Sequence, residues 1–149
     1  MNRPWWLLIE DDQVDTMSVE RSLRVAGSEI DLAVVPNGFE PVEHFRASMR
    51  ERHGFPPQLI LLDINLPLAS GHEVLSALKA APEARRVPVV MLTTSGHDRD
   101  IHEAYERGAA GYFVKPLDFS AFTEAIRVLA DYWALARLPP VVANAALQR

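Results

Sequence analysis

Residues 58–67 read Gln-Leu-Ile-Leu-Leu-Asp-Ile-Asn-Leu-Pro, and this stretch decides the fold of the chain. It follows two prolines, stays apolar over residues 59–62, and reaches its first charge at Asp63. A short Leu/Ile run between turn residues is typical of a strand buried on both faces, as in a parallel sheet covered by helices. A helix would not fit between Pro57 and Pro67. The stretch therefore predicts a buried strand that delivers Asp63 to the edge of a sheet, where open α/β folds bind ligands.

The composition is that of one ordinary globular domain. The chain has 149 residues, of which 48% are hydrophobic and 23% charged. The absence of cysteine excludes a disulfide framework, a thiolate zinc site and a cysteine nucleophile. The net charge is -5 and the basic residues form no stripe, so we expect no binding to nucleic acid. No apolar run approaches the roughly 20 residues of a membrane span, and three acids at 10–12 argue against a signal peptide, so we expect no membrane association and a cytoplasmic location.

Strand and helix patterns alternate along the rest of the chain. Apolar runs that end in polar residues predict strands at 5–9, 30–35, 59–62, 87–92 and 111–114, with 30–35 at a sheet edge. Apolar residues at helical spacing predict helices at 14–26, 39–52, 98–107 and about 118–138. Another predicted helix follows Gly71, contains Val74, Leu75 and Leu78, and is closed by Pro82. Such alternation is typical of a doubly wound α/β fold, with a five-stranded parallel sheet and helices on both faces. The adjacent Trp5 and Trp6 are interpreted as core residues of the first strand.

Most of the chemically useful polar residues directly follow the predicted strands. They are Glu10, Asp11 and Asp12, then Asp63, then Thr93 and Thr94, and finally Lys115. Because the carboxyl ends of parallel strands meet at one edge of a sheet, these side chains should converge there. Clustered carboxylates repel one another unless a cation joins them, and oxygen ligands of this kind suit Mg²⁺. A metal held by Asp11 and Asp63, with Glu10 nearby, would leave Asp63 free to act as a nucleophile and form an aspartyl-phosphate.

Two further side chains suit phosphoryl transfer at this edge. The reaction passes through a loose transition state, so its catalysis depends on positioning and on neutralising the charge of the phosphoryl oxygens. The Lys115 ammonium supplies a compact positive charge for one oxygen, and the Thr93 hydroxyl can donate a hydrogen bond to another. Each residue taken alone has a simpler explanation, as a helix start, a cap or a turn residue. Four suitable residues, each at the end of its own strand, favour a shared site.

Four short motifs resemble the receiver domain of two-component response regulators. They are Leu-Ile-Glu-Asp-Asp at 8–12, Leu-Leu-Asp-Ile-Asn-Leu-Pro at 61–67 followed by Gly71, Leu-Thr-Thr-Ser at 92–95, and Gly-Tyr-Phe-Val-Lys-Pro at 111–116. The resemblance covers residues 5–133 and implies a flavodoxin- or CheY-like fold with the strand order 2-1-3-4-5. We expect a receiver domain at 4–138, followed by a tail at 139–149 that is too short for an output domain.

The resemblance implies that Asp63 is the phosphoacceptor, which takes a phosphoryl group from a partner histidine kinase with Mg²⁺. Glu10 and Asp11 correspond to the acidic pair at the metal, and the backbone carbonyl of Asn65 corresponds to a further metal ligand. The first acid of the pair is a glutamate in this chain, a variation that the family accommodates. The resemblance therefore implies a metal site made by Glu10, Asp11, Asp63 and Asn65.

The resemblance also assigns roles to residues on the last two strands. Thr93 and Lys115 correspond to the residues that contact the phosphoryl group, and Tyr112 to an aromatic switch residue that turns inward as the threonine moves towards the phosphate. The Lys115–Pro116 bond resembles the family's cis peptide, which would aim the lysine amine at the site. Such a protein catalyses its own phosphorylation and dephosphorylation, but it is a signalling switch and not an enzyme in the usual sense.

The Leu-Thr-Thr-Ser motif, the long loop before residue 58 and the last helix resemble small response regulators paired with bacterial phytochromes. Those proteins are stand-alone receivers that take phosphate from a light-regulated histidine kinase and commonly form homodimers. We expect a homodimer through the fourth and fifth helices, because Trp133 and Leu135 extend the apolar character of the last helix. The alternative is that these residues fold back on their own domain. The five histidines are interpreted as surface residues and not as metal ligands: 44, 53, 72, 97 and 102.

Two other functions stay open from the sequence. One is a dimeric scaffold whose phosphorylation is vestigial, for which Asp63→Asn would leave the phenotype intact. The other is a flavodoxin-like cofactor binder. The sequence disfavours the cofactor binder, because the acids at 10–12 would repel a phosphate where that function needs a Ser/Thr/Gly-rich cradle.

Overall fold

Five parallel strands alternate with five helices over residues 3–140, the part of the chain that the computed structural model describes. The strands are β1 (Trp5–Ile9), β2 (Asp31–Val35), β3 (Leu59–Leu62), β4 (Val89–Thr93) and β5 (Gly111–Val114). The helices are α1 (Gln13–Val25), α2 (Pro41–Arg50), α3 (Gly71–Ala80), α4 (Asp98–Glu106) and α5 (Phe119–Leu135). Each predicted strand and helix is present. Most of the predicted tail, residues 141–149, lies outside the described residues.

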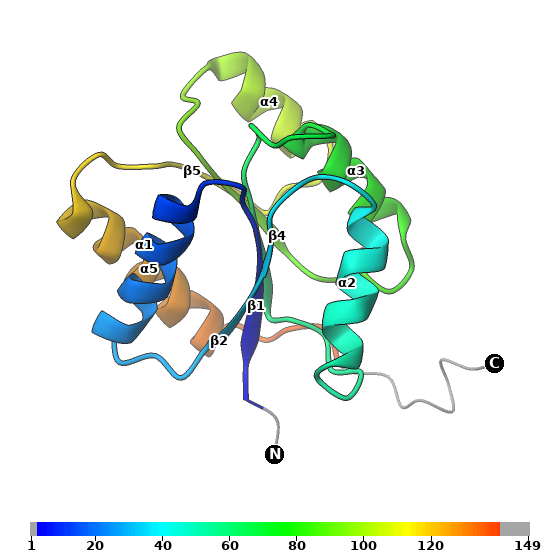
Figure 1. Ribbon diagram of the computed structural model, residues 1–149, viewed down its shortest axis with the longest axis horizontal. Coiled ribbons are helices and arrows are strands. Elements are labelled where there is room, and N and C mark those ends of the chain that lie inside the picture. Colours follow the sequence, from blue (N-terminus) through cyan, green and yellow to red (C-terminus); the bar gives the residue numbers. More distant parts are fainter. Residues whose placement is uncertain (1–2, 141–149) are drawn as a thin grey trace.

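The strands pair in the order β2-β1-β3-β4-β5, which confirms the predicted topology. Figure 1 shows α1 and α5 on one face of the sheet and α2, α3 and α4 on the other. Strands β1, β3 and β4 are buried along their whole length because helices cover both of their faces. Over residues 3–140, no helix combines the length and the apolar character needed to cross a membrane.

The sheet separates two apolar cores, and adjacent residues of β1 enter different ones. Trp5 packs in the core beneath α2, α3 and α4, together with Phe45 of α2. Trp6 packs in the core beneath α1 and α5, together with Leu23 of α1 and Ile126 of α5. Successive side chains of a strand point to opposite faces, so two adjacent tryptophans can anchor both cores at once. Their exposed fractions of 2% and 0% confirm the prediction that both are core residues.

Strand β4 and helix α5 differ from their predicted bounds near proline residues. Strand β4 begins at Val89 and not at residue 87, because Pro88 has no N–H to donate to the sheet. Helix α5 ends at Leu135 and not at residue 138, and Ala136 already has an extended backbone. The chain thus leaves the helix ahead of Pro139, whose preceding residue is disfavoured in helical geometry. The predicted end of the last helix was three residues too late.

Gly71 allows the start of α3 to pack against the backbone that carries Asp63. A Cβ atom at this position would overlap the carbonyl oxygen of Asp63 and lie 2.6 Å from the Cα atom of Ile64. The Gly71 N–H donates a hydrogen bond to the Ile64 carbonyl oxygen at 2.8 Å. The hydroxyl of Ser70 accepts a hydrogen bond from the Glu73 N–H and caps the helix. The loop after β3 is therefore closed tightly by backbone contacts, and a side chain at residue 71 would open it.

Gly71→Ala should destabilise the fold by about 3 kcal/mol or more, because the added methyl group meets backbone atoms that cannot move aside as a side chain would. Urea unfolding at fixed pH measures the change. Gly96→Ala is the matched control, since a Cβ there would meet only a methyl group of Val114 at 3.8 Å. Equal stability of the two variants would show that the close approach at Gly71 is unimportant.

Candidate functional site

The register of the sheet brings the predicted site residues to one edge. Ile9 of β1 pairs with Leu62 of β3, so Glu10 and Asp63 follow their strands at the same level. The backbone N–H of Asp63 donates to the carbonyl oxygen of Ile9 at 3.1 Å, which fixes the end of β3 against β1. Between β4 and β5, the N–H of Lys115 donates to the carbonyl oxygen of Thr93 at 2.7 Å. The predicted convergence of these residues is thus present in the fold.

The buried ammonium group of Lys115 connects three carboxylates at this edge. Its Nζ atom donates to Glu10 Oε1 at 2.5 Å, to Asp15 Oδ2 at 2.7 Å and to Asp63 Oδ2 at 3.1 Å. Lys115, Glu10 and Asp63 are all buried, with 8%, 3% and 7% of their surface exposed. Buried charges are tolerated when they are paired in this way. Lys115 therefore neutralises part of the negative charge but cannot neutralise all of it.

Asp15 is a member of the site that the sequence analysis missed. It lies in the first turn of α1, where its N–H donates to the carboxylate of Asp12, the N-cap of this helix. The sequence contained one signal for Asp15. A residue three positions after an N-cap lies in the first turn of the helix, and the first turn of α1 lies beside the end of β1, where Glu10 follows. The pattern alone gave no reason to choose Asp15 over the other acids nearby.

The prediction of a cis Lys115–Pro116 peptide is wrong for this structure, because none of the peptide bonds between residues 3 and 140 is cis. The amine of Lys115 reaches Glu10, Asp15 and Asp63 with the trans bond. The length and flexibility of the lysine side chain make the cis geometry unnecessary for these contacts.

The three predicted acidic ligands lie close enough to share a cation. Glu10, Asp11 and Asp63 each offer a carboxylate oxygen, and these atoms lie within 4.8 Å of one another. Glu10 and Asp63 are buried, whereas Asp11 is exposed and so gives the site an open side. A cluster of oxygen ligands that keeps access to water fits Mg²⁺ well. The N–H of Asn65 donates to Asp63 Oδ1 at 3.3 Å, and the metal-ligand role of its carbonyl stays a prediction.

The ionisation of Glu10 reflects the excess of negative charge. Burial raises the pKa of the Glu10 carboxyl to about 7, and the charge of Asp63 adds to this, although the hydrogen bond from Lys115 acts in the opposite direction. Burial also opposes the charge of Lys115, but hydrogen bonds to Asp15 and Glu10 outweigh it and raise the lysine pKa. Without a further cation, the site therefore holds a charged lysine beside a glutamate that loses its proton only around neutral pH.

Ser95 links the predicted switch residues Thr93 and Tyr112. Thr93 is completely buried at the end of β4, and its Oγ1 accepts a hydrogen bond from the Ser95 N–H at 3.4 Å. The hydroxyl of Tyr112 donates to the Ser95 carbonyl oxygen at 2.8 Å. The hydroxyl of Ser95 itself donates to Asp100 Oδ2 of α4 at 2.5 Å. A movement of Thr93 would therefore reach both Tyr112 and α4 through one residue.

His72 is the histidine that the sequence analysis placed wrongly. It lies in the first turn of α3 with only 6% of its surface exposed, because α4 packs over it. Its Nε2 atom faces the carboxylates of Asp100 and Glu103 on α4. By contrast, His97 and His102 are exposed, as expected. A polar residue at the start of a helix is expected at the surface unless the position of the neighbouring helix is known. The sequence therefore gave no signal that His72 would be buried.

Comparison with known proteins relates most of the described fold to one family of signalling domains. The family model of the response regulator receiver domain matches residues 6–127. The probable methanogenesis regulatory protein FilR2 of Methanothrix harundinacea is 34% identical over 128 residues, which cover 85% of this chain and 81% of that protein. Response regulator Rcp1 of Synechocystis is 30% identical over 127 residues, which cover 85% of this chain and 86% of that protein.

Solved structures show the same likeness in three dimensions. The phosphorylated cyanobacterial phytochrome response regulator RcpA matches with a TM-score of 0.83 and 29% identity, covering 93% of this chain and 99% of that one. The Mn²⁺-bound form of Rcp1 matches with a TM-score of 0.78 and 30% identity, covering 92% of this chain and 99% of that one. Phosphorylation and divalent-metal binding are thus properties of two proteins that this chain resembles.

In metal-free buffer, the stability of the protein should fall as the pH rises from about 5 to about 8. The folded-state pKa of Glu10 is about 7 against an ordinary value of 4.5, so its contribution is fully present below 4.5 and is lost as the pH rises through 7. The change is at most about 3 kcal/mol. Urea unfolding in the presence of EDTA measures it.

Glu10→Gln is the control for this prediction, because glutamine keeps the shape of the side chain but does not titrate. The difference in stability between the two proteins should vary across this pH range. A constant difference would mean that Glu10 has an ordinary pKa in the folded protein.

Proposed function

Because the chain belongs to the response regulator receiver family, we propose that it is a phosphorylation-controlled signalling switch in which Asp63 accepts a phosphoryl group from a histidine kinase. The observation that carries the proposal is the contact of Asp63 with the buried ammonium of Lys115, beside Glu10 and Asp11. This arrangement supplies a nucleophile, a fixed positive charge and a place for a divalent cation at one edge of the sheet. The resemblance to phosphorylated RcpA supports the same reading.

The residues of this chain have separate tasks in the proposed reaction. A carboxylate oxygen of Asp63 forms the new bond to phosphorus while the bond between phosphorus and the donor's leaving group breaks, and the electron pair leaves with that group. Lys115 holds a carboxylate oxygen and supplies charge to a phosphoryl oxygen, and the Thr93 hydroxyl donates to another. Mg²⁺ held by Glu10, Asp11 and Asp63, with the Asn65 carbonyl, would add positive charge beside the phosphoryl oxygens.

The proposed switch acts through α4, the helix with the least apolar anchorage. Of its residues, only Ala104 is buried, so polar contacts largely hold its position. When the Thr93 hydroxyl turns towards a phosphoryl group, its hydrogen bond with the Ser95 N–H is lost. Tyr112 and Asp100 both bond to Ser95, so the new position of Ser95 would shift Tyr112 and the first turn of α4 together.

An exposed apolar rim beside Asp63 supports a protein phosphodonor. Val14 and Met17 of α1 are 71% and 66% exposed, and Leu117 is fully exposed. Asp15 contacts Lys115, so Val14 and Leu117 lie near the same edge of the site. Exposed apolar residues around a reactive group favour docking of a protein over that of a small molecule. We propose a sensor histidine kinase as the partner, with the cytoplasm as the place of action and, by similarity to RcpA, a phytochrome as the input.

The outer face of α4, β5 and α5 supports a homodimer. Its exposed apolar residues include Tyr105, Val114, Tyr132 and Leu135, and Leu135 is 85% exposed. Trp133, in contrast, packs against the core of its own domain. The same face favours the second candidate function, a dimeric scaffold in which phosphorylation is vestigial.

Incubation with a small phosphodonor and Mg²⁺ should add a single phosphoryl group to the wild-type protein, measured by intact mass. Asp63→Asn and addition of EDTA should each abolish the adduct, because the first removes the nucleophile and the second the cation. Asp12→Asn is the matched control: it removes a neighbouring acid, and asparagine caps a helix as well as aspartate. A folded, metal-binding protein without an adduct would favour the scaffold.

Leu135→Glu should weaken the proposed dimer at least about tenfold, because it buries a charge in the apolar contact. Sedimentation over a concentration series measures the dissociation constant, with and without the phosphodonor. Val25→Glu is the control, since Val25 is 64% exposed at the end of α1. Equal effects of both variants, or a wild-type protein that stays monomeric, would contradict this dimer.

A further inference from the structure

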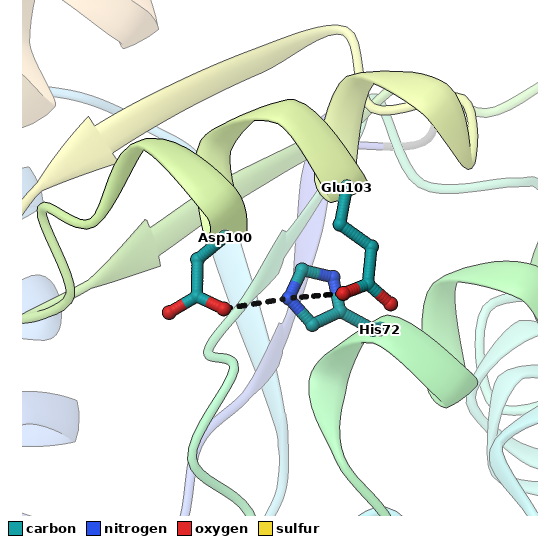
Figure 2. Close-up of side chains that lie close together, drawn as sticks. All are labelled: His72, Asp100 and Glu103. Atoms are coloured by element: carbon teal, nitrogen blue, oxygen red, sulfur yellow. Dashed lines mark hydrogen bonds and ion pairs between the residues drawn. The ribbon is translucent and has the colours of Figure 1, made fainter.

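A second group of possible metal ligands lies between α3 and α4, apart from the edge that carries Asp63. It consists of His72 of α3 and of Asp100 and Glu103 of α4, and Figure 2 shows the imidazole ring between the two carboxylates. We propose that these three side chains form a binding site for a transition-metal dication such as Zn²⁺, which joins the two helices. The proposal depends on this geometry and not on the proposed phosphorylation.

The distances between the three side chains leave room for an ion. His72 Nε2 lies 3.4 Å from Asp100 Oδ1 and 3.9 Å from Glu103 Oε1. A direct charge-assisted hydrogen bond would bring these atoms to about 2.7–2.9 Å, so neither carboxylate makes a strong bond to the ring. Ligands of a tetrahedral ion with bonds of about 2.0 Å lie about 3.3 Å apart. The two separations are therefore closer to those around a shared ion than to those of a compact ion pair.

Each carboxylate has its outer oxygen held by a neighbouring donor, which leaves the inner oxygen aimed at the ring. The Ser95 hydroxyl donates to Asp100 Oδ2 at 2.5 Å. The guanidinium of Arg107 contacts Glu103 Oε2 at 2.8 Å. Hydrogen bonds to the far oxygen of a ligating carboxylate are what orients ligands in metal sites.

The ring of His72 is held in place by burial. Only 8% of its side chain is exposed, and its second nitrogen, Nδ1, is buried with no hydrogen-bond partner in the part of the chain that the structure describes. The side chains of Asp100 and Glu103 are 27% and 37% exposed, so an ion can enter from their side. Water can complete the coordination there. The site thus combines one rigid nitrogen ligand with two adjustable oxygen ligands.

The ligand types select the kind of metal. Imidazole suits Zn²⁺, Cu²⁺, Fe²⁺ and Ni²⁺, whereas Mg²⁺ prefers carboxylates, carbonyls and water. The edge at Asp63 offers only oxygen ligands and the site at His72 offers a nitrogen. The two sites should therefore prefer different metals, and an excess of Mg²⁺ should occupy the first without filling the second.

A bound ion would hold α4 against α3. Helix α4 buries only Ala104, and Arg107 attaches it to α3 by donating to the His72 carbonyl oxygen and the Ser76 hydroxyl. Coordination by Asp100 would also fix the partner of the Ser95 hydroxyl. The expected result is a more stable fold in which α4 keeps the position seen here.

Titration calorimetry with Zn²⁺ in excess Mg²⁺ tests the site on the full chain. The wild-type protein should bind about one Zn²⁺ under these conditions. His72→Gln should abolish binding, and Glu103→Gln should weaken it about tenfold or more, since loss of even an outer-shell partner costs that much. His102→Gln is the matched control, because His102 pairs with Glu106 on the exposed side of the same helix and should bind as the wild type does.

Glu103 is only partly buried, so Glu103→Gln keeps the test valid if His72→Gln, a change at a buried residue, prevents folding. A second measurement is the melting temperature, which Zn²⁺ should raise in the wild type and His102→Gln, and should raise clearly less in Glu103→Gln at the same Zn²⁺ concentration. Equal Zn²⁺ binding by the wild type and Glu103→Gln would overturn the proposal, as would the absence of Zn²⁺ binding in excess Mg²⁺. The latter would show that these residues form an ordinary ion pair.

Discussion

The ammonium group of Lys115 lies buried at the end of the sheet, in contact with carboxylates of Glu10, Asp15 and Asp63. Glu10 follows β1, Asp15 lies in α1 and Asp63 follows β3, whereas the lysine itself follows β5. One cation therefore ties β1, β3, β5 and α1 together at this edge. Removing one partner of a buried ion pair destabilises the fold by far more than the pair's net contribution to stability, because the other charge stays buried and unpaired. The arrangement of the whole edge therefore depends on this lysine.

The same edge carries more negative charge than one lysine can balance, and this excess is the physical basis of its proposed function. Burial and the charge of Asp63 raise the pKa of Glu10, which is a measure of how poorly the site tolerates its own carboxylates. A site with this imbalance would favour a cation, and a group that brings a cation with it. Reactive sites of this kind commonly reduce the stability of the fold that holds them.

Polar contacts, and not apolar packing, position α4. Ser95 holds Asp100 at one end of the helix, and Arg107 attaches the other end to α3. Ala104 is the only fully buried residue of the helix, whereas α3 and α5 each bury several large apolar side chains. An element held in this way can move without opening the core, since few apolar contacts have to be broken. This is the property that a signalling surface needs.

The sequence by itself determined the architecture and most of the edge. Apolar runs, prolines and helical spacing were enough to place every strand and helix over residues 3–140, and the polar residues after the strands identified Glu10, Asp63 and Lys115. Local periodicity carries this information, because it depends on which face of each element is buried. Even here, the predicted start of β4 and the predicted end of α5 were wrong by a few residues, in both cases near a proline.

Only the tertiary structure decided which side chains meet between elements. Asp15 contacts the lysine, and His72 is buried against Asp100 and Glu103. The physical reason is the same in both cases. A helix docks at an angle and height fixed by packing over its whole length, so the polar neighbours of a residue at its surface depend on distant parts of the chain and leave no periodic trace in the sequence.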